Sequence, residues 1–133
     1  MSFRSLRPTK LFVAAVVVGA MALATAAQAH PKLVSASPAA NTAITSTNQL
    51  KLTFSEALVA QFSGMSVLMT DMPGMKMSAP MSVGAVTSKV AADGKTLVGT
   101  LKSPLPAGTY TLDWHAVTAD THRVEGSYSF TVK

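Results

Sequence analysis

The chain has 133 residues, a formal net charge of +5 and eight methionines, but no cysteine. The lack of cysteine excludes disulfide bonds, a cysteine nucleophile, a thiolate zinc site and a blue-copper centre. A chain of this length suits one small domain that an ordinary hydrophobic core must stabilise.

Residues 1–29 have the pattern of a secretory signal peptide. Three basic residues occur within the first ten, residues 11–27 are apolar and alanine-rich, and Ala27-Gln28-Ala29 fits a cleavage site. A transmembrane anchor is the competing interpretation, but the apolar run is slightly short for one. We expect cleavage after Ala29, which leaves residues 30–133 as one soluble domain.

The remaining charge argues against two classes of partner. Residues 30–133 contain eight basic and six acidic residues, a net charge of +2. These charges are few and scattered, so they do not favour binding to nucleic acid or to a membrane surface.

Short alternating segments separated by Pro, Gly, Asn and Ser predict strands rather than helices. The expected strands are 32–35, 49–54, 65–69, 82–90, 96–101, 109–117 and 127–132. The longest has Tyr110, Leu112, Trp114 and Ala116 on one side, and we expect Trp114 to anchor the core. Seven or so strands with regular turns predict an all-β sandwich or barrel.

A methionine-rich stretch, residues 69–81, does not fit a core element. Pro73, Gly74 and Pro80 interrupt it, so it reads as a loop. Thioethers are soft donors that suit Cu(I) best among biological metals. The candidate Cu(I) ligands are Met69, Met72, Met75, Met77 and Met81. The alternative is a flexible apolar surface for a partner protein. Met65 shares a strand face with Met69 and is expected in the core.

Nitrogen and oxygen donors form a second candidate set. If cleavage follows Ala29, His30 offers its α-amine and imidazole to one metal ion. Asp120 and His122 lie two residues apart, so they point the same way if the chain is locally extended. Neither feature indicates a metal site by itself. A histidine at the new N-terminus can arise by chance from the cleavage position, and Asp-x-His is common in ordinary surface turns. Together they form a tetragonal set for Cu(II), with Glu56 as a possible further oxygen donor or supporting group.

Several motifs occur in order along the chain, and they resemble the CopC family of periplasmic copper-binding proteins, which includes PcoC. They are His30-Pro-Lys-Leu-Val34, Phe54-Ser-Glu-Ala-Leu58, Gln61-Phe-Ser-Gly64, Met69-Thr-x-Met-Pro-Gly-Met75, Pro106-Ala-Gly-Thr-Tyr110, Asp113-Trp-x-Ala-Val117 and Asp120-Thr-His122. The resemblance implies a Greek-key β-sandwich or barrel, immunoglobulin-like or cupredoxin-like, with copper sites at its two ends.

The resemblance also implies ligands and partners. The Cu(II) site would use His30, Asp120 and His122, with Glu56 at a position proposed as a ligand in some members. The methionine loop would bind Cu(I). Relatives with this loop often carry a histidine near the position of Met77, so this loop is a softer, all-thioether site. The implied partners are an inner-membrane CopD-type transporter or a periplasmic multicopper oxidase.

Three functions follow. The leading hypothesis is a monomeric, non-enzymatic periplasmic copper carrier in copper homeostasis or resistance. An immunoglobulin-like module that binds a partner through its methionine loop is the first alternative. A copper-brace monooxygenase is the second, disfavoured because Asp120 would occupy coordination that oxygen chemistry needs open and because no aromatic substrate platform is evident.

Overall fold

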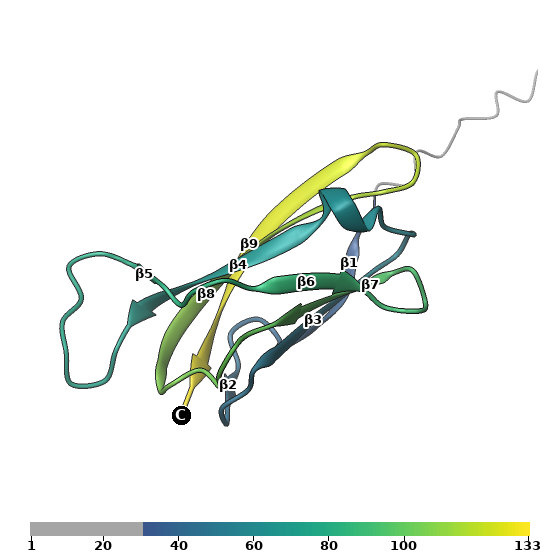
Figure 1. Ribbon diagram of the computed structural model, residues 1–133. Coiled ribbons are helices and arrows are strands. Elements are labelled where there is room, and N and C mark those ends of the chain that lie inside the picture. Colours follow the sequence, from purple (N-terminus) through teal and green to yellow (C-terminus); the bar gives the residue numbers. More distant parts are fainter. Residues whose placement is uncertain (1–30) are drawn as a thin grey trace, which may run out of the picture.

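A computed structural model describes residues 31–133, which form nine strands in two sheets and one short 3₁₀ helix (Figure 1). The strands are β1 (Leu33–Ser37), β2 (Ala43–Ile44), β3 (Gln49–Phe54), β4 (Gly64–Asp71), β5 (Met81–Ser82), β6 (Thr87–Val90), β7 (Thr96–Thr100), β8 (Gly108–Val117) and β9 (Arg123–Val132), and the helix η1 is Ala60–Phe62.

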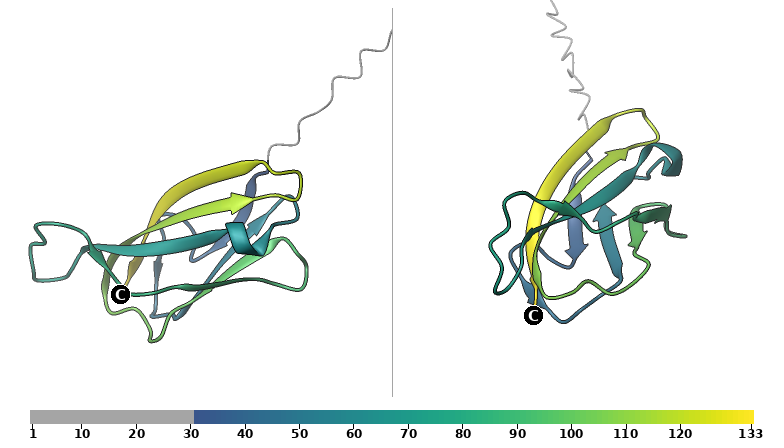
Figure 2. Two further views of the ribbon diagram at one scale, coloured as in Figure 1. Left: turned by 45° about the horizontal axis from the view of Figure 1, so that its top comes forward. Right: turned by 60° about the vertical axis from the view of Figure 1, so that its left-hand side comes forward.

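The two sheets form a sandwich, seen from two further sides in Figure 2. One sheet has the strand order β1-β3-β7-β6 and the other β2-β9-β8-β4-β5. All neighbouring strands are antiparallel except β2 and β9. Successive strands cross repeatedly between the sheets, as Greek-key connections do. The predicted all-β sandwich is confirmed.

Alternation along the strands builds the core between the sheets. Leu50, Leu52 and Phe54 of β3 are at most 1% exposed, and their polar neighbours face outward. The inward residues of β8 are those predicted from its alternation. Trp114 is half-buried and contacts Phe54 edge-on at a ring-centroid distance of 5.1 Å, which supports its predicted role as a core anchor.

Apart from the unpredicted β2, the largest differences from the predicted strands concern two segments. Segment 82–90 divides into β5 and β6, because Gly84 has φ of 101° where the chain passes from one sheet to the other. The last strand begins at Arg123, not at residue 127. Gly126 lies outside the predicted strands, but a Cβ there would lie 2.6 Å from the Trp114 ring, so glycine permits close packing inside the strand.

The longest strands separate the two candidate sites. β8 has ten residues and spans about 30 Å. The loop that joins β4 to β5 projects from one end of the sandwich, and the β8–β9 turn lies at the other (Figure 1). No helix within residues 31–133 is long and apolar enough to cross a membrane. The predicted signal peptide, 1–29, lies outside the described residues.

Candidate metal-binding sites

The β8–β9 turn brings Asp120 and His122 together. Nδ1 of His122 lies 2.9 Å from Oδ2 of Asp120, and the two side chains are 48% and 53% exposed, respectively. The sequence predicts this pairing for a locally extended chain. Instead, Thr121 between them has φ of 72°, so a left-handed residue in a turn produces the contact.

Asp120 is held as a charged carboxylate. Its Oδ1 accepts hydrogen bonds from the Thr118 hydroxyl and, at 3.4 Å, from the backbone N–H of His122. The Thr118 bond, followed by the bond from the His122 side chain, lowers the pKa of Asp120 from 3.8 to about 2. The turn therefore offers a hard, anionic oxygen beside an imidazole. Thr118 was not singled out from the sequence, where it is one more threonine at a strand end.

Backbone hydrogen bonds tie two other segments to this end of the sandwich. The Ala119 N–H donates to the Ala57 carbonyl at 3.2 Å. The Ser55 N–H donates to the Lys32 carbonyl at 2.9 Å, and the Lys32 N–H donates to the Ser55 hydroxyl at 2.9 Å. The first described residues and segment 55–58 therefore lie at the same end as the turn.

The remaining predicted Cu(II) ligands do not complete a site among the described residues. Glu56 is half-buried within the anchored segment 55–58. Across residues 31–133, no three His, Asp or Glu side chains are grouped so that they could hold a metal ion. Asp120 and His122 thus form a pair without Glu56 as a third ligand. His30 lies outside the described residues.

At the opposite end, the methionine-rich loop begins with a tight turn. The Met75 N–H donates to the Met72 carbonyl at 3.1 Å, and the two residues form an isolated antiparallel bridge. Gly74 has φ of 77°, and proline followed by such a glycine is the signature of a type II turn. The turn brings Met72 and Met75 across from each other.

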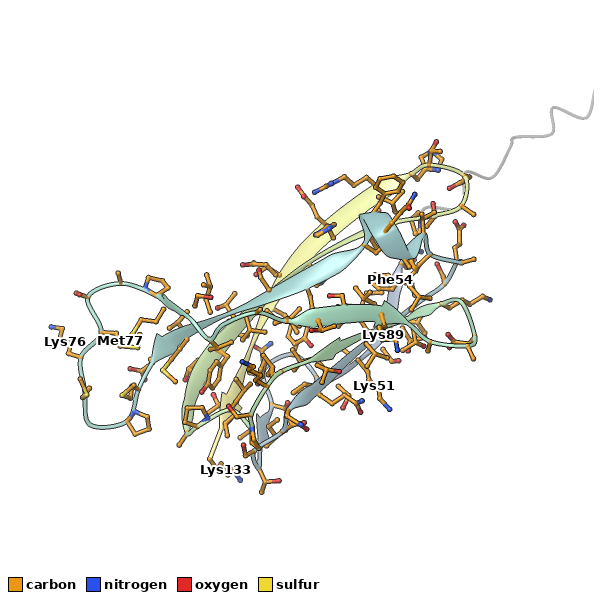
Figure 3. All side chains as sticks on the ribbon, in the orientation of Figure 1. Lys51, Phe54, Lys76, Met77, Lys89 and Lys133 are labelled. Carbon is orange, nitrogen blue, oxygen red and sulfur yellow. The ribbon has the colours of Figure 1, made fainter. Side chains whose placement is uncertain are left out.

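The five candidate thioethers differ in exposure. Met69 lies on β4, is 5% exposed and pairs directly with Met81 of β5. Met72 and Met77 are partly buried against the core, whereas Met75 and Met81 are 63% and 57% exposed. Figure 3 shows Met77 on the loop that extends beyond the sheets. The soft donors therefore range from the core to solvent.

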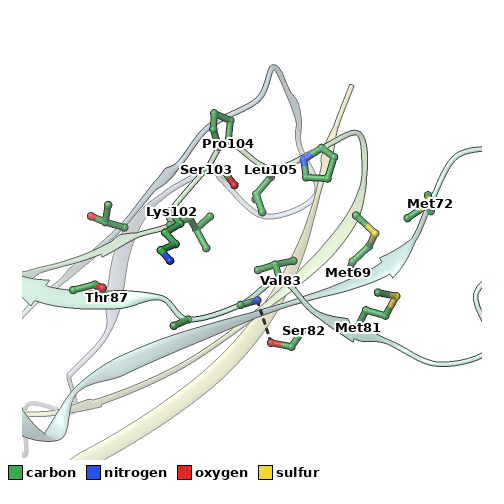
Figure 4. Close-up of a pocket in the computed structure, with 15 residues that line it drawn as sticks. Met69, Met72, Met81, Ser82, Val83, Thr87, Lys102, Ser103, Pro104 and Leu105 are labelled. Atoms are coloured by element: carbon green, nitrogen blue, oxygen red, sulfur yellow. Dashed lines mark hydrogen bonds between the residues drawn. The ribbon is translucent and has the colours of Figure 1, made fainter.

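Three of these methionines line a cavity of about 830 Å³ at the base of the loop. Met69, Met72 and Met81 form one side, and segment 101–106 contributes Leu105 and its flanking prolines (Figure 4). The cavity is mainly apolar. Its lining residues from segment 101–106 were not predicted as part of any site, because they are an ordinary Pro-rich connection in the sequence.

Two other residues with donor atoms lie apart from these groups, and Met65 lies in the core as predicted. Met65 is 8% exposed in the core, and its sulfur occupies the space that a side chain on Gly99 would fill. His115 faces away from the core on β8, and its ring lies close to Gly64. Neither belongs to a candidate site.

The described chain is thus a β-sandwich with thioethers at one end and a carboxylate–imidazole pair at the other. Residues 33–133 match the family model described as the CopC domain. The chain therefore belongs to the CopC family.

Individual relatives cover most of the chain. It is 50% identical over 123 residues to copper resistance protein C of Pseudomonas syringae pv. tomato, with 92% of each chain covered. It is 48% identical to copper resistance protein C of Escherichia coli, covering 85% of this chain and 89% of the relative. The crystal structure of PcoC, a methionine-rich copper resistance protein from E. coli, has a TM-score of 0.70 and 45% identity, covering 79% of this chain and 100% of PcoC.

Proposed function

We propose that this protein is a periplasmic copper carrier with two sites and no catalytic step. Cu(II) binds the His30 α-amine and imidazole, Asp120 and His122, with Glu56, which is not grouped with that pair among the described residues, as a supporting group. Cu(I) binds the methionine loop, through Met69, Met72, Met75, Met77 and Met81. Copper then passes to a CopD-type inner-membrane transporter or a multicopper oxidase, in copper resistance or homeostasis. The separation of hard and soft donors at opposite ends of the sandwich carries this proposal.

The Asp120–His122 pair supports the Cu(II) site. The contact of 2.9 Å already holds an anionic oxygen and an imidazole together, so little reorganisation is needed on binding. Two side chains alone are too few donors for Cu(II), which prefers a tetragonal set of nitrogen and oxygen ligands. The other nitrogens come from His30, which is two residues before Lys32, whose backbone is hydrogen-bonded to Ser55.

The pairing of methionines supports the Cu(I) site. Met69 is opposite Met81 across two strands, and Met72 is opposite Met75 across a turn. Thioether sulfur is a soft ligand that selects Cu(I) over hard cations. The two exposed members, Met75 and Met81, let copper enter and leave, which a carrier needs. The names of the relatives, copper resistance protein C, support copper as the cargo.

The decisive experiment combines mass spectrometry with copper titration. The exported protein is purified from the periplasm, its intact mass is measured, and it is titrated with Cu(II) and, under a reductant, with Cu(I). The expected result is a chain beginning at His30 that binds one ion of each oxidation state. After reduction of the bound Cu(II), copper is expected to move from the nitrogen and oxygen ligands to the thioethers.

Other results select other functions. A chain that begins elsewhere, or one that binds Cu(I) alone, contradicts the Cu(II) site and leaves a thioether carrier. A protein that binds neither ion contradicts the carrier. The exposed Met75 and Met81 and the apolar cavity would then favour a module that binds a partner protein.

A further inference from the structure

We infer that Thr118 is a positioning residue for the Cu(II) site, holding the Asp120 carboxylate in the orientation that it shares with His122. This inference rests on the proposed function. Thr118 itself does not bind the metal. It acts through Asp120, because its hydroxyl donates to only one of the two carboxylate oxygens, Oδ1.

The Thr118 side chain is placed for this role by burial. The residue is 1% exposed and is one of only two buried polar residues among residues 31–133. Its hydroxyl donates to Asp120 Oδ1 and lies 3.3 Å from the His122 carbonyl. A hydroxyl has one hydrogen, and its closer contact is with the carboxylate. The buried hydroxyl of Thr118 thus donates its hydrogen bond to the Asp120 carboxylate, which belongs to the candidate Cu(II) site.

The two carboxylate oxygens consequently have different partners. Oδ1 accepts from the Thr118 hydroxyl and, at the longer distance of 3.4 Å, from the His122 N–H, whereas Oδ2 lies 2.9 Å from Nδ1 of the His122 ring. Without the Thr118 hydroxyl, the half-exposed carboxylate can rotate and exchange its partners for water. Groups that orient metal ligands in this way typically contribute 10- to 100-fold to metal affinity.

The backbone of the turn does not depend on this hydroxyl. The Thr118 N–H donates to the His122 carbonyl at 2.9 Å, and the Thr118 carbonyl accepts from the Thr121 N–H at 2.8 Å. Thr118 also pairs with Leu58 as an isolated bridge. A substitution that removes only the hydroxyl should therefore leave the turn in place. Thr118→Val is such a change, because valine keeps the branched shape.

The test compares three variants of the protein that begins at His30. Thr118→Val removes the hydroxyl, and Thr118→Ser keeps it. Thr96→Val is the matched control, because the Thr96 hydroxyl donates to Asp93 Oδ2 at 2.6 Å in a different turn. Cu(II) affinity is measured by competition with a chelator, and the electron paramagnetic resonance spectrum reports the ligands. Cu(I) affinity is measured in parallel as a check on the fold.

T118V is expected to bind Cu(II) about 10- to 100-fold more weakly, with a changed spectrum and unchanged Cu(I) affinity. T118S and T96V are expected to match the wild type. The Asp120→Ala background supplies a second test: it leaves no side-chain oxygen at position 120, so if Thr118 acts through the carboxylate, T118V should have no further effect there. Should T118V not fold, Thr118→Ala applies the same test without the added methyl group.

The outcomes separate this inference from the function on which it rests. Wild-type Cu(II) affinity in T118V overturns the role of Thr118 and leaves the Cu(II) site standing. Equal losses in T118V and T96V also overturn it, since the effect would then be general. A wild-type protein that binds no Cu(II) overturns both the site and the inference.

Discussion

Met69 and Met81 face each other across β4 and β5, one 5% and the other 57% exposed. This pair closes the base of the methionine-rich loop, so the thioethers between them belong to one confined segment. Side chains directly opposite in an antiparallel pair have Cβ atoms about 5 Å apart, so the two methionine sulfurs can reach the same metal ion. The candidate thioether donors therefore extend from the core to solvent.

Replacing the four thioethers beyond β4 should abolish Cu(I) binding. In the variant Met72→Leu, Met75→Leu, Met77→Leu and Met81→Leu, sulfur is lost and apolar volume is nearly kept. Leucine for methionine usually costs less than about 1.5 kcal/mol even in a core. We expect an intact fold, normal Cu(II) binding and no Cu(I) binding, measured by competition titration under reductant.

The control for this variant is Met65→Leu. Met65 is buried outside the loop, so its replacement should leave Cu(I) affinity at the wild-type value. Retention of Cu(I) binding by the fourfold variant would contradict the thioether site. If the loop instead binds a partner protein, the fourfold variant should still bind that partner, because leucine preserves an apolar contact surface.

Gly74→Ala should weaken Cu(I) binding through the backbone alone. Nothing lies within 4 Å of a Cβ at this position, but φ is 77°, which disfavours alanine by about 1 kcal/mol. If the metal-free variant relieves this strain by opening the turn, Cu(I) binding must close the turn again, which corresponds to a loss of about fivefold in Cu(I) affinity. Isothermal titration calorimetry or competition titration would measure this loss of Cu(I) affinity.

Gly94→Ala provides the matched control for Gly74→Ala. Gly94 has φ of 72° and also has nothing within 4 Å of its Cβ position, but it lies in the β6–β7 turn. It should show a similar local strain and no change in Cu(I) affinity. Equal losses of Cu(I) affinity in the two variants would refute a specific role for the Met72–Met75 turn.

The sequence predicted the sandwich because alternation is strong wherever one sheet face is buried. β3 and β8 show this pattern most clearly. It did not predict β2, whose two residues carry no periodicity and pair with β9 from a distant part of the chain. It also misplaced the start of β9, since glycine usually signals a loop. Only the tertiary contact between Gly126 and Trp114 explains that glycine.

The candidate sites divide in the same way. Donor chemistry was readable from residue type, so methionines 69–81 and the Asp120–His122 pair were predicted. Their geometry was not, because it depends on the left-handed conformation of Thr121 and on the β4–β5 register. The hydroxyl of Thr118 could not be singled out from other threonines, because its burial beneath the turn is a tertiary feature.

Gly126→Ala should destabilise the fold. The added Cβ would lie 2.6 Å from the Trp114 ring, so the indole or β9 must shift. Overpacking of this kind typically costs about 1 to 3 kcal/mol in the free energy of unfolding. Denaturant unfolding should show a lower midpoint with little change in slope. Stability equal to the wild type would show that the ring moves aside without cost.

Asp120 should titrate unusually low in the metal-free protein. Its pKa is lowered to about 2, below the ordinary value of 3.8, chiefly by the Thr118 hydroxyl. A lowered pKa in the folded state means that the contribution of this carboxylate to stability is present above pH 3.8 and is lost as the pH falls toward 2. Carboxyl-carbon NMR would measure the titration directly. In T118V the pKa should rise toward the ordinary value, whereas an unchanged pKa would contradict this hydrogen bond.

Cu(II) affinity should depend on the residue at which the mature chain begins. Adding one alanine before His30 moves the α-amine away from the imidazole, so the two can no longer close the same chelate ring around Cu(II). We expect a Cu(II) affinity lower by several orders of magnitude and a changed electron paramagnetic resonance spectrum. Cu(I) affinity should be unaffected, because β8 separates the two ends by about 30 Å.

The control is a protein with the same alanine added after Lys133, which should bind both ions normally. An extended protein with wild-type Cu(II) affinity would exclude the terminal amine as a ligand. The Asp120–His122 pair would then need nitrogen donors other than the amine.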